Sequence, residues 1–233
     1  MKLADLRHEV WAANQQLVES GLVCLTFGNA SGIDRESGIV AIKPSGVPYA
    51  QLEPANMVLV DLDGNVVEGE LKPSSDTATH VLLYREFAGV GGIVHVHSKH
   101  ATALCQMGQE LPCLGTTHAD HFAGTVPMAR ALTAQEVDEG YEHATGVAIV
   151  ECFANLDPVA IPAVLQHFHA PFAWAPSATK AVENAIALEM CAEMALAQLA
   201  AGRELSPIPR HILDKHYARK HGTDSYYGQD SKS

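Results

Sequence analysis

Two histidines that alternate with valines constrain the fold of this chain more strongly than any other feature. They lie in the run GIVHVH at residues 92–97, which is short, rich in β-branched residues and opened by glycine, as is typical of a strand. Side chains alternate between the two faces of a strand, so His95 and His97 are expected to project from the same face. At about 7 Å apart along the strand, two imidazoles can bind one Zn²⁺ or a similar ion. The alternative, a hydrogen-bonded pair of core histidines, remains open on this pattern alone.

The length and composition favour a single α/β domain. A chain of 233 residues, 47% of them hydrophobic and 18% charged, can bury one substantial core. Predicted strands and helices follow one another without strict alternation, which favours a mixed sheet. The formal net charge of −12 argues against a nucleic-acid partner. Any phosphate binding must therefore depend on local groups.

The N-terminus and the cysteines bear on where the protein resides. The first 21 residues space their apolar side chains as an amphipathic helix does and carry internal charges, unlike a signal peptide. No apolar run approaches the length of about 18 residues that a membrane span needs. The 5 cysteines include no C-x-x-C pair, which favours reduced, buried thiols. We therefore expect a cytoplasmic protein that contacts no membrane.

Periodicity and turn residues predict the other elements. Helices are expected over residues 74–87, 98–108, 133–144 and 177–201, the last capped by Ser177 and closed by Gly202. Strands are expected over residues 22–34, 38–47, 147–153 and 163–174, and Asp63-Gly64 predicts a hairpin within residues 57–69. No repeat or linker interrupts residues 1–233, so one domain is predicted.

A second H-x-H pair and a carboxylate extend the predicted metal site. His167 and His169 repeat the spacing on a later predicted strand, so one of them can supply a third nitrogen ligand. Asp76 begins a predicted helix and can add an oxygen. Three imidazoles and one carboxylate form a sensible Zn²⁺ set that leaves room for a substrate in the coordination shell. Two separated H-x-H pairs favour a metal site over core histidines.

Three loops rich in glycine and serine predict a site for a phosphate or a polyol. They are GNASG at residues 28–32, KPSG at 43–46 and PSSD at 73–76. Tight loops of this kind offer backbone N–H and hydroxyl donors, and Lys43 adds a positive charge. Each loop taken alone is also compatible with an ordinary turn. The usual nucleotide and hydrolase signatures are missing from the sequence, and the S-x-x-K match at residues 177–180 is interpreted as a helix cap.

Together these residues resemble the L-ribulose-5-phosphate 4-epimerase branch of the class II (zinc) aldolase superfamily. The resemblance runs from the first helix to the tail, in order and without large insertions. It rests on GNASGIDRESG, IKPSGV, KPSSDT, GGIVHVHSKHAT, GTTHADHFAGT, HAPFAWA, LDKHYARKHG and YYGQ. It implies a three-layer α/β/α sandwich around a mixed, largely antiparallel sheet. It also implies a cyclic homotetramer with active sites between subunits.

The resemblance further implies roles for individual residues. One Zn²⁺ per subunit, or another divalent ion, would be bound by Asp76, His95, His97 and His169. Contacts to the phosphorylated pentulose substrate fall on Gly28, Asn29, Lys43, Ser45, Gly46, Ser74 and Ser75, with His216 at a further position in the tail. Asp120 and Tyr227 fall on the acid/base pair. The tail, about residues 210–233, would contribute to a neighbouring subunit's site.

The implied reaction interconverts L-ribulose 5-phosphate and D-xylulose 5-phosphate. Inverting a carbon that bears no acidic proton requires transient oxidation or bond cleavage, and the missing dinucleotide motif favours retro-aldol cleavage and re-addition at C3–C4. A Lewis-acidic metal would stabilise the enediolate, and the phosphate site would retain the aldehyde fragment. Two acid/base groups would serve opposite faces of the substrate.

Three alternatives are weighed against this interpretation. A class II sugar-phosphate aldolase of the same superfamily is disfavoured by Asp76, where a glutamate is expected, and by the YYGQ tail. A non-catalytic, adducin-like domain should have lost its histidine ligands. A metallohydrolase barrel needs about 250 residues and places H-x-H nearer the N-terminus. Departures from the family pattern remove no ligand and bear only on substrate preference; they are Phe27, Val96, His121, Ala170 and Ala175.

Overall fold

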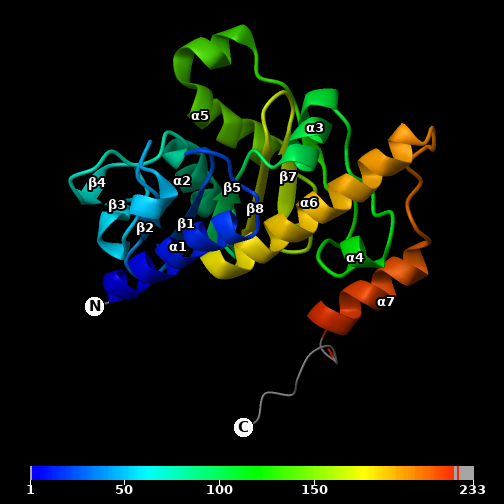
Figure 1. Ribbon diagram of the computed structural model, residues 1–233, viewed down its shortest axis with the longest axis horizontal. Helices are drawn as coiled ribbons and strands as arrows, with labels where there is room; N and C mark the ends of the chain where they lie inside the picture. The colour runs from blue at the N-terminus through cyan, green and yellow to red at the C-terminus, as the bar shows by residue number, and fades with distance from the viewer. Residues whose placement is uncertain (1, 223–224, 226–233) are drawn as a thin grey trace.

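A mixed sheet forms the centre of the molecule (Figure 1). The computed structural model describes residues 2–222 and Ser225, so the predicted acid/base residue Tyr227 lies outside the described residues. Within that part of the chain the sheet has 8 strands in the order β4-β3-β2-β1-β5-β8-β7-β6. All neighbours are antiparallel except β6 and β7, which are parallel. The prediction of a mixed, largely antiparallel sheet is confirmed.

The strands are short. Their bounds are β1 (Asn29–Asp34), β2 (Ile39–Ile42), β3 (Val58–Val60), β4 (Val66–Glu68), β5 (Gly92–His95), β6 (Met128–Ala129), β7 (Ala163–Gln166) and β8 (Pro171–Ala175). The predicted hairpin within residues 57–69 is confirmed, since β3 and β4 pair on either side of Gly64.

Helices cover both faces of the sheet, as Figure 1 shows. α1 (Lys2–Glu19), α3 (Lys99–Met107) and α6 (Ala178–Ala200) pack on one face, and α2 (Thr77–Glu86) and α5 (Ala134–Cys152) pack on the other. Each face of the sheet therefore has its own hydrophobic core. Side chains alternate along β5, so Val94 packs in the core beneath α1, α3 and α6, and Ile93 packs in the core beneath α2 and α5. The result is the three-layer α/β/α sandwich that the resemblance implies. The shorter elements are α4 (Thr116–Ala119), α7 (Arg210–His221) and the 3₁₀ helices Tyr49–Gln51 and Pro54–Asn56.

Two helix predictions are confirmed in detail. Leu6, Val10 and Leu17 of α1 are buried in the core, as the amphipathic pattern predicts. Ser177 caps α6, because its hydroxyl accepts from the backbone N–H of Lys180 at 3.3 Å. No helix in the described part of the chain is long and apolar enough to cross a membrane.

The prediction of a strand over residues 147–153 is wrong, because they lie in the C-terminal half of α5 and at its C-cap. Short apolar runs do not distinguish a strand from a helix with a buried face, and here Ala148 and Ile149 supply that face. Gly146 lets α5 approach α2, since a Cβ at this position would lie 2.9 Å from Cδ2 of Leu82. This close contact between helices favours the helical conformation over strand pairing.

Residues 163–174 form two strands where one was predicted. β7 ends at Gln166 and β8 begins at Pro171, and the chain reverses between them with Phe168 at a φ of 62°. His167 and His169 therefore lie in a turn. Residues 22–28 precede β1 as a loop, and β5 ends at His95, so both predicted strands are shorter than expected.

The start of α2 lies later than the prediction of a helix over residues 74–87. The helix begins at Thr77, whose Oγ1 donates to the carbonyl of Ser74 at 2.6 Å. Asp76 occupies the N-cap position without a side-chain cap hydrogen bond. Its carboxylate accepts instead from Nδ2 of Asn29 in β1, at 2.6 Å. The helix start therefore directs a carboxylate toward the sheet.

Candidate active site

Three imidazoles converge near the middle of the sheet. His95 ends β5, His97 follows it, and His169 lies in the turn between β7 and β8. β5 and β8 are neighbours, so residues far apart in the sequence meet there. One ring nitrogen from each histidine lies within 4.8 Å of the others. Of the two candidates for a third ligand, His169 joins this histidine cluster, whereas His167 stacks on Phe168 with ring centroids 3.7 Å apart.

Hydrogen bonding and burial keep the histidine cluster in the form that binds metals. Nδ1 of His95 donates to the carbonyl of Pro171 at 3.0 Å, which leaves the Nε2 lone pair available. Nδ1 of His169 is buried without a hydrogen-bond partner among the described residues. Burial lowers the pKa of His95 and His97, and lowers the pKa of His169 to about 3, so all three are neutral near pH 7. Neutral imidazoles at this spacing fit a divalent ion such as Zn²⁺.

Asp76 lies beside the histidine cluster, although its carboxylate is not among the groups that lie within 4.8 Å of one another. Its Oδ2 accepts from Asn29 at 2.6 Å and from Oγ of Ser74 at 3.4 Å. Burial acts to raise the pKa of Asp76, but nearby His95 and His80 and the hydrogen bond from Asn29 outweigh it and lower the pKa. Asp76 is therefore an anion next to three neutral nitrogen donors.

A cleft of about 370 Å³ opens beside the histidine cluster. Its lining brings together the three loops rich in glycine and serine, and contains Gly28, Asn29, Lys43, Ser45, Gly46, Ser74, Ser75, Asp76 and the three histidines. Every predicted substrate contact except His216 therefore lies in one cleft. Whether these residues bind a substrate stays a prediction.

Lys43 is the cation of this cleft, and its side chain is nearly inaccessible, with 2% of the residue exposed. Its ammonium lies 4.8 Å from the ring centroid of Tyr49 and 3.4 Å from the carbonyl oxygens of Thr26 and Pro44. Burial lowers the pKa of Lys43, and the charge of Asp76 acts in the opposite direction. No carboxylate among the described residues lies within ion-pair distance of this ammonium. A buried charge in this position favours an anionic ligand.

Tyr141 and Glu142 also line the cleft, and neither was predicted from the sequence. They follow Gly140, a non-helical residue that interrupts α5 with φ 163° and ψ 78°. The Tyr141 ring lies against His169, with ring centroids 5.6 Å apart. The signal that could have found them is the glycine inside a predicted helix, since such glycines often have a packing or functional reason.

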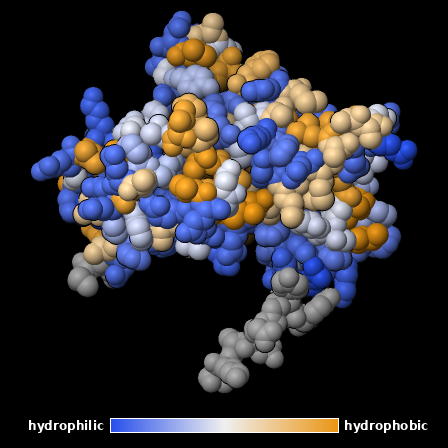
Figure 2. All heavy atoms as spheres, viewed as in Figure 1, coloured by the Kyte–Doolittle hydropathy of each residue, from blue (hydrophilic) through white to orange (hydrophobic). Residues whose placement is uncertain are grey.

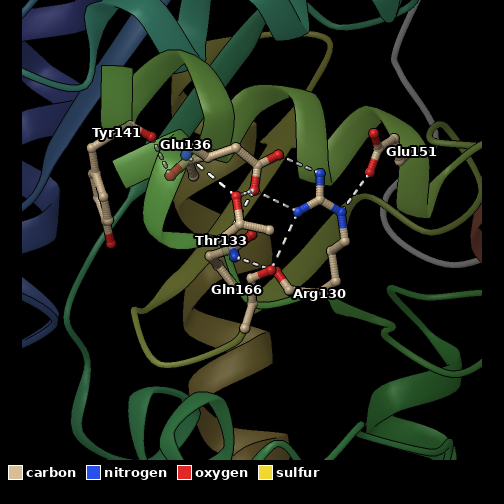
Figure 3. Close-up of polar contacts among 8 residues, drawn as sticks. Arg130, Thr133, Glu136, Tyr141, Glu151 and Gln166 are labelled. Carbon is tan, nitrogen blue, oxygen red and sulfur yellow. Dashed lines mark hydrogen bonds and ion pairs between the residues drawn. The ribbon is translucent and has the colours of Figure 1, made fainter. Parts of the chain in front are cut away.

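Figure 3 shows how the interruption in α5 is held. Arg130 donates from Nε to Glu151 and from Nη2 to Glu136, each at 2.7 Å. One guanidinium therefore joins the parts of α5 before and after Gly140, and we call these three residues the Arg130 clamp. Gln166 at the end of β7 donates to the carbonyl of Arg130 at 2.8 Å. The Arg130 clamp thus ties both parts of α5, between which Tyr141 lies, to each other and to the end of β7.

Asp120 and His216 lie together, but in a different place. Asp120 follows α4 and accepts from Nδ1 of His216 at 3.2 Å and from Nε of Arg219 at 2.9 Å, both in α7. Burial acts to raise its pKa, but the hydrogen bonds from Arg219 and His216 and the charge of Lys220 outweigh it and lower the pKa. Asp120 lines a cavity of about 520 Å³ that shares no lining residue with the cleft. One chain thus presents the histidine cluster and Asp120 in separate cavities.

Comparison with known proteins assigns the chain to a family. Residues 8–196 match the family described as Class II Aldolase and Adducin N-terminal domain. The chain is 48% identical over 227 residues to the L-ribulose-5-phosphate 4-epimerase UlaF of Salmonella paratyphi B (strain ATCC BAA-1250 / SPB7), a match that covers 97% of this chain and 100% of that protein. This α/β/α sandwich with its histidine cluster belongs to the class II aldolase and adducin family.

Solved structures share the fold. An L-fuculose 1-phosphate aldolase matches with a TM-score of 0.75 at 28% identity, over 92% of this chain and 95% of its own. An L-fuculose-1-phosphate aldolase from Thermus thermophilus matches with a TM-score of 0.67 at 25% identity, over 88% of this chain and 100% of its own.

Proposed function

We propose that this protein is a metal-dependent L-ribulose-5-phosphate 4-epimerase that interconverts L-ribulose 5-phosphate and D-xylulose 5-phosphate. The observation that carries the proposal is that the histidine cluster and the buried Lys43 line one cleft. The histidines suit a Lewis-acidic ion and Lys43 suits a phosphate, so the cleft can bind both ends of a sugar phosphate. The similarity to UlaF over 97% of the chain supports this reaction.

The proposed metal is one Zn²⁺ per subunit, with Asp76 and the histidine cluster as its ligands. When bound, the ion supplies Lewis acidity at the substrate oxygens. Lys43 and the loops around it bind the phosphate and keep the aldehyde fragment in the cleft while its carbonyl turns. Re-addition to the opposite face of that carbonyl then inverts C4.

The proposed acid/base residues, Asp120 and Tyr227, would act at the cleft of a neighbouring subunit in a homotetramer. This arrangement is supported by the position of Asp120, which lines a separate cavity within its own chain. The tail from about residue 210 would supply Tyr227, with His216 already beside Asp120. A surface for a partner is available along α6, where Ile186, Met190 and Met194 are 36%, 54% and 44% exposed, and apolar groups are visible on this face in Figure 2.

A class II sugar-phosphate aldolase is the second candidate, because L-fuculose 1-phosphate aldolase shares the fold at 28% identity. Both reactions cleave a carbon–carbon bond, and they differ in whether the aldehyde fragment leaves. The higher identity to UlaF, 48%, favours the epimerase. The epimerase also requires strong retention of the phosphate, which a buried Lys43 is suited to provide.

A coupled assay for D-xylulose 5-phosphate formed from L-ribulose 5-phosphate tests the proposal. We expect activity to disappear when a chelator removes the metal and to return with Zn²⁺. His97→Ala should lose bound metal and activity together. His167→Ala is the matched control, because His167 lies in the same turn as His169 but outside the histidine cluster, and it should keep both. Full activity in a metal-free preparation would contradict the proposal.

Isotopically labelled glycolaldehyde phosphate, added during turnover, separates the two candidates. An epimerase that retains its fragment should exchange little label into product. Free aldehyde as the main product would favour the aldolase.

A further inference from the structure

The helix that follows His97 is capped by a residue from a distant helix. α3 begins two residues after His97, and its N-cap residue Ser98 makes no side-chain cap hydrogen bond. The acceptors come instead from Glu189 in α6, the helix that passes beside α3 in Figure 1. Oε1 of Glu189 accepts from the backbone N–H of His100 at 3.0 Å, and Oε2 accepts from that of Ala101 at 2.9 Å. One carboxylate thus satisfies two of the free N–H groups with which a helix begins.

The contact between Glu189 and α3 is charge-assisted. Burial acts to raise the pKa of Glu189, but the hydrogen bonds from Ala101 and His100 outweigh it and lower the pKa, so Glu189 is an anion. An anion at the N-terminus of a helix interacts favourably with the helix dipole. Nδ1 of His100 lies 2.8 Å from the same Oε1, and the side chain of Glu189 is only 17% exposed. The cap is therefore largely shielded from solvent and ties the first turn of α3 to α6.

His97 is the proposed ligand nearest to this cap. β5 ends at His95, and His97 lies in the short connection between that strand and α3. His95 is held by strand pairing and by its hydrogen bond to the carbonyl of Pro171, whereas the His97 ring makes no hydrogen bond within the described part of the chain. The His97 ring contacts those of His95 and His169, each with centroids 5.0 Å apart. Its place therefore depends on the two ends of the connection, which are the strand and the capped helix.

We propose that Glu189 is a positioning residue of the metal centre. By tying the start of α3 to α6, it fixes where the connection from β5 ends and so keeps the His97 imidazole directed at the other two histidines. Glu189 itself touches neither the ion nor the substrate. The inference rests on the proposed metal site and adds a residue from a helix that supplies no ligand.

Glu189→Gln tests this role with a side chain of nearly the same size. An amide has one acceptor oxygen, so the two backbone N–H groups can no longer each have an oxygen of their own, and one of them faces an N–H donor. Loss of a contact that orients a metal ligand typically weakens metal binding about 10–100-fold. Because Glu189 acts through the backbone, we expect a loss of about tenfold, at the lower end of that range.

Glu9→Gln is the matched control. Glu9 in α1 caps another helix in the same way, because its Oε1 accepts from the backbone N–H of Ala178, the first residue of α6, at 2.9 Å. No proposed ligand lies in the connection that leads into α6. We therefore expect Glu9→Gln to lose stability but to keep the metal affinity of the wild type. His100→Ala should keep that affinity as well, because it leaves both backbone hydrogen bonds to Glu189 in place.

The measurement is the affinity of the purified protein for Co²⁺ by chelator competition, with the visible spectrum of the Co²⁺ form as a second readout of the ligand geometry. Urea unfolding of the same variants without metal shows how far each substitution lowers stability. Should Glu189→Gln fail to fold, Glu189→Asp carries the test, because it keeps the charge but is one methylene shorter. The same loss of Co²⁺ affinity is expected from it.

Equal Co²⁺ affinity in the wild type and Glu189→Gln would overturn the inference, as would equal losses of affinity in Glu189→Gln and Glu9→Gln. Epimerase activity of the wild type, measured in the same series, keeps this result apart from the proposed function. An active wild type whose Co²⁺ affinity does not depend on Glu189 contradicts only the role of Glu189. An inactive wild type whose Co²⁺ affinity depends on Glu189 contradicts only the reaction.

Discussion

Gly28 connects the phosphate loops to the histidine cluster, and replacing it by alanine tests that connection. Its φ is +81°, a conformation that favours glycine. A Cβ at this position would lie 2.9 Å from the carbonyl oxygen of His95 and 3.3 Å from Cγ1 of Val23. The first of these atoms is backbone at the end of β5, so it has little freedom to move. Gly28→Ala should therefore disturb both the loop and His95.

The expected loss of stability has two parts. A left-handed conformation costs an ordinary residue about 1–2 kcal/mol. The close contact with a fixed backbone adds about 1–3 kcal/mol, as overpacking does elsewhere, so the free energy of unfolding should fall by about 2–5 kcal/mol. Gly21→Ala is the matched control, because Gly21 has a φ of +71° and no atom within 4 Å of its Cβ position. It should lose only the conformational part, about 1–2 kcal/mol.

Urea unfolding of the wild type and both variants, at one protein concentration, measures the difference. Chelator competition on the same samples should show weaker metal binding in Gly28→Ala and unchanged binding in Gly21→Ala, because the displaced carbonyl belongs to His95. Equal losses of stability in the two variants, with equal metal affinity, would refute this reasoning.

Other sites give independent tests. Lys43→Met should weaken binding of L-ribulose 5-phosphate about tenfold to hundredfold, since hydrogen bonds to charged groups contribute about 1.5–3 kcal/mol. Binding of free L-ribulose should barely change. Equal losses of affinity for the two sugars would mean that Lys43 has only a structural role. Tetramers assembled from a mixture of Asp120→Asn and Tyr227→Phe subunits should regain activity in about a quarter of their sites if Asp120 and Tyr227 meet across an interface. No gain of activity after verified subunit exchange would exclude that arrangement. Burial lowers the pKa of His118 to about 4. The unfolded chain takes up this proton near pH 6.5 and the folded chain does not, so stability should fall by about 3 kcal/mol as the pH drops from 6.5 to 4. His118→Asn should flatten that part of the pH dependence, and an unchanged slope in urea unfolding would contradict the assignment.

The parts of the site that follow from local rules were predictable from sequence. Strand alternation predicted that His95 and His97 project from the same face, and turn-forming residues predicted the loops that line the cleft. Tyr141 was not predictable in this way, because its position depends on the interruption of α5 at Gly140 and on packing against the sheet. The strand predicted over residues 147–153 failed for a related reason, since a short apolar run is decided by the partner it packs on.

Local sequence patterns could not predict contacts between residues that lie far apart in the chain. Asp120 and His216 are 96 positions apart, and only the family resemblance suggested that both belong near a site. The structure adds that α7 surrounds Asp120 with His216, Arg219 and Lys220. No periodicity in the tail predicts which carboxylate those groups would meet.

The Arg130 clamp makes one wall of the cleft sensitive to the solvent. Its side chains are partly open to solvent, with those of Arg130, Glu151 and Glu136 41%, 53% and 26% exposed. Dissolved salt screens such pairs, over a length of about 8 Å at physiological ionic strength and about 3 Å at 1 M. In the histidine cluster His95 is buried and its Nδ1 donates to the carbonyl of Pro171, an uncharged contact that salt does not screen. High ionic strength should therefore loosen the hold on the two parts of α5, between which Tyr141 lies, sooner than it disturbs His95.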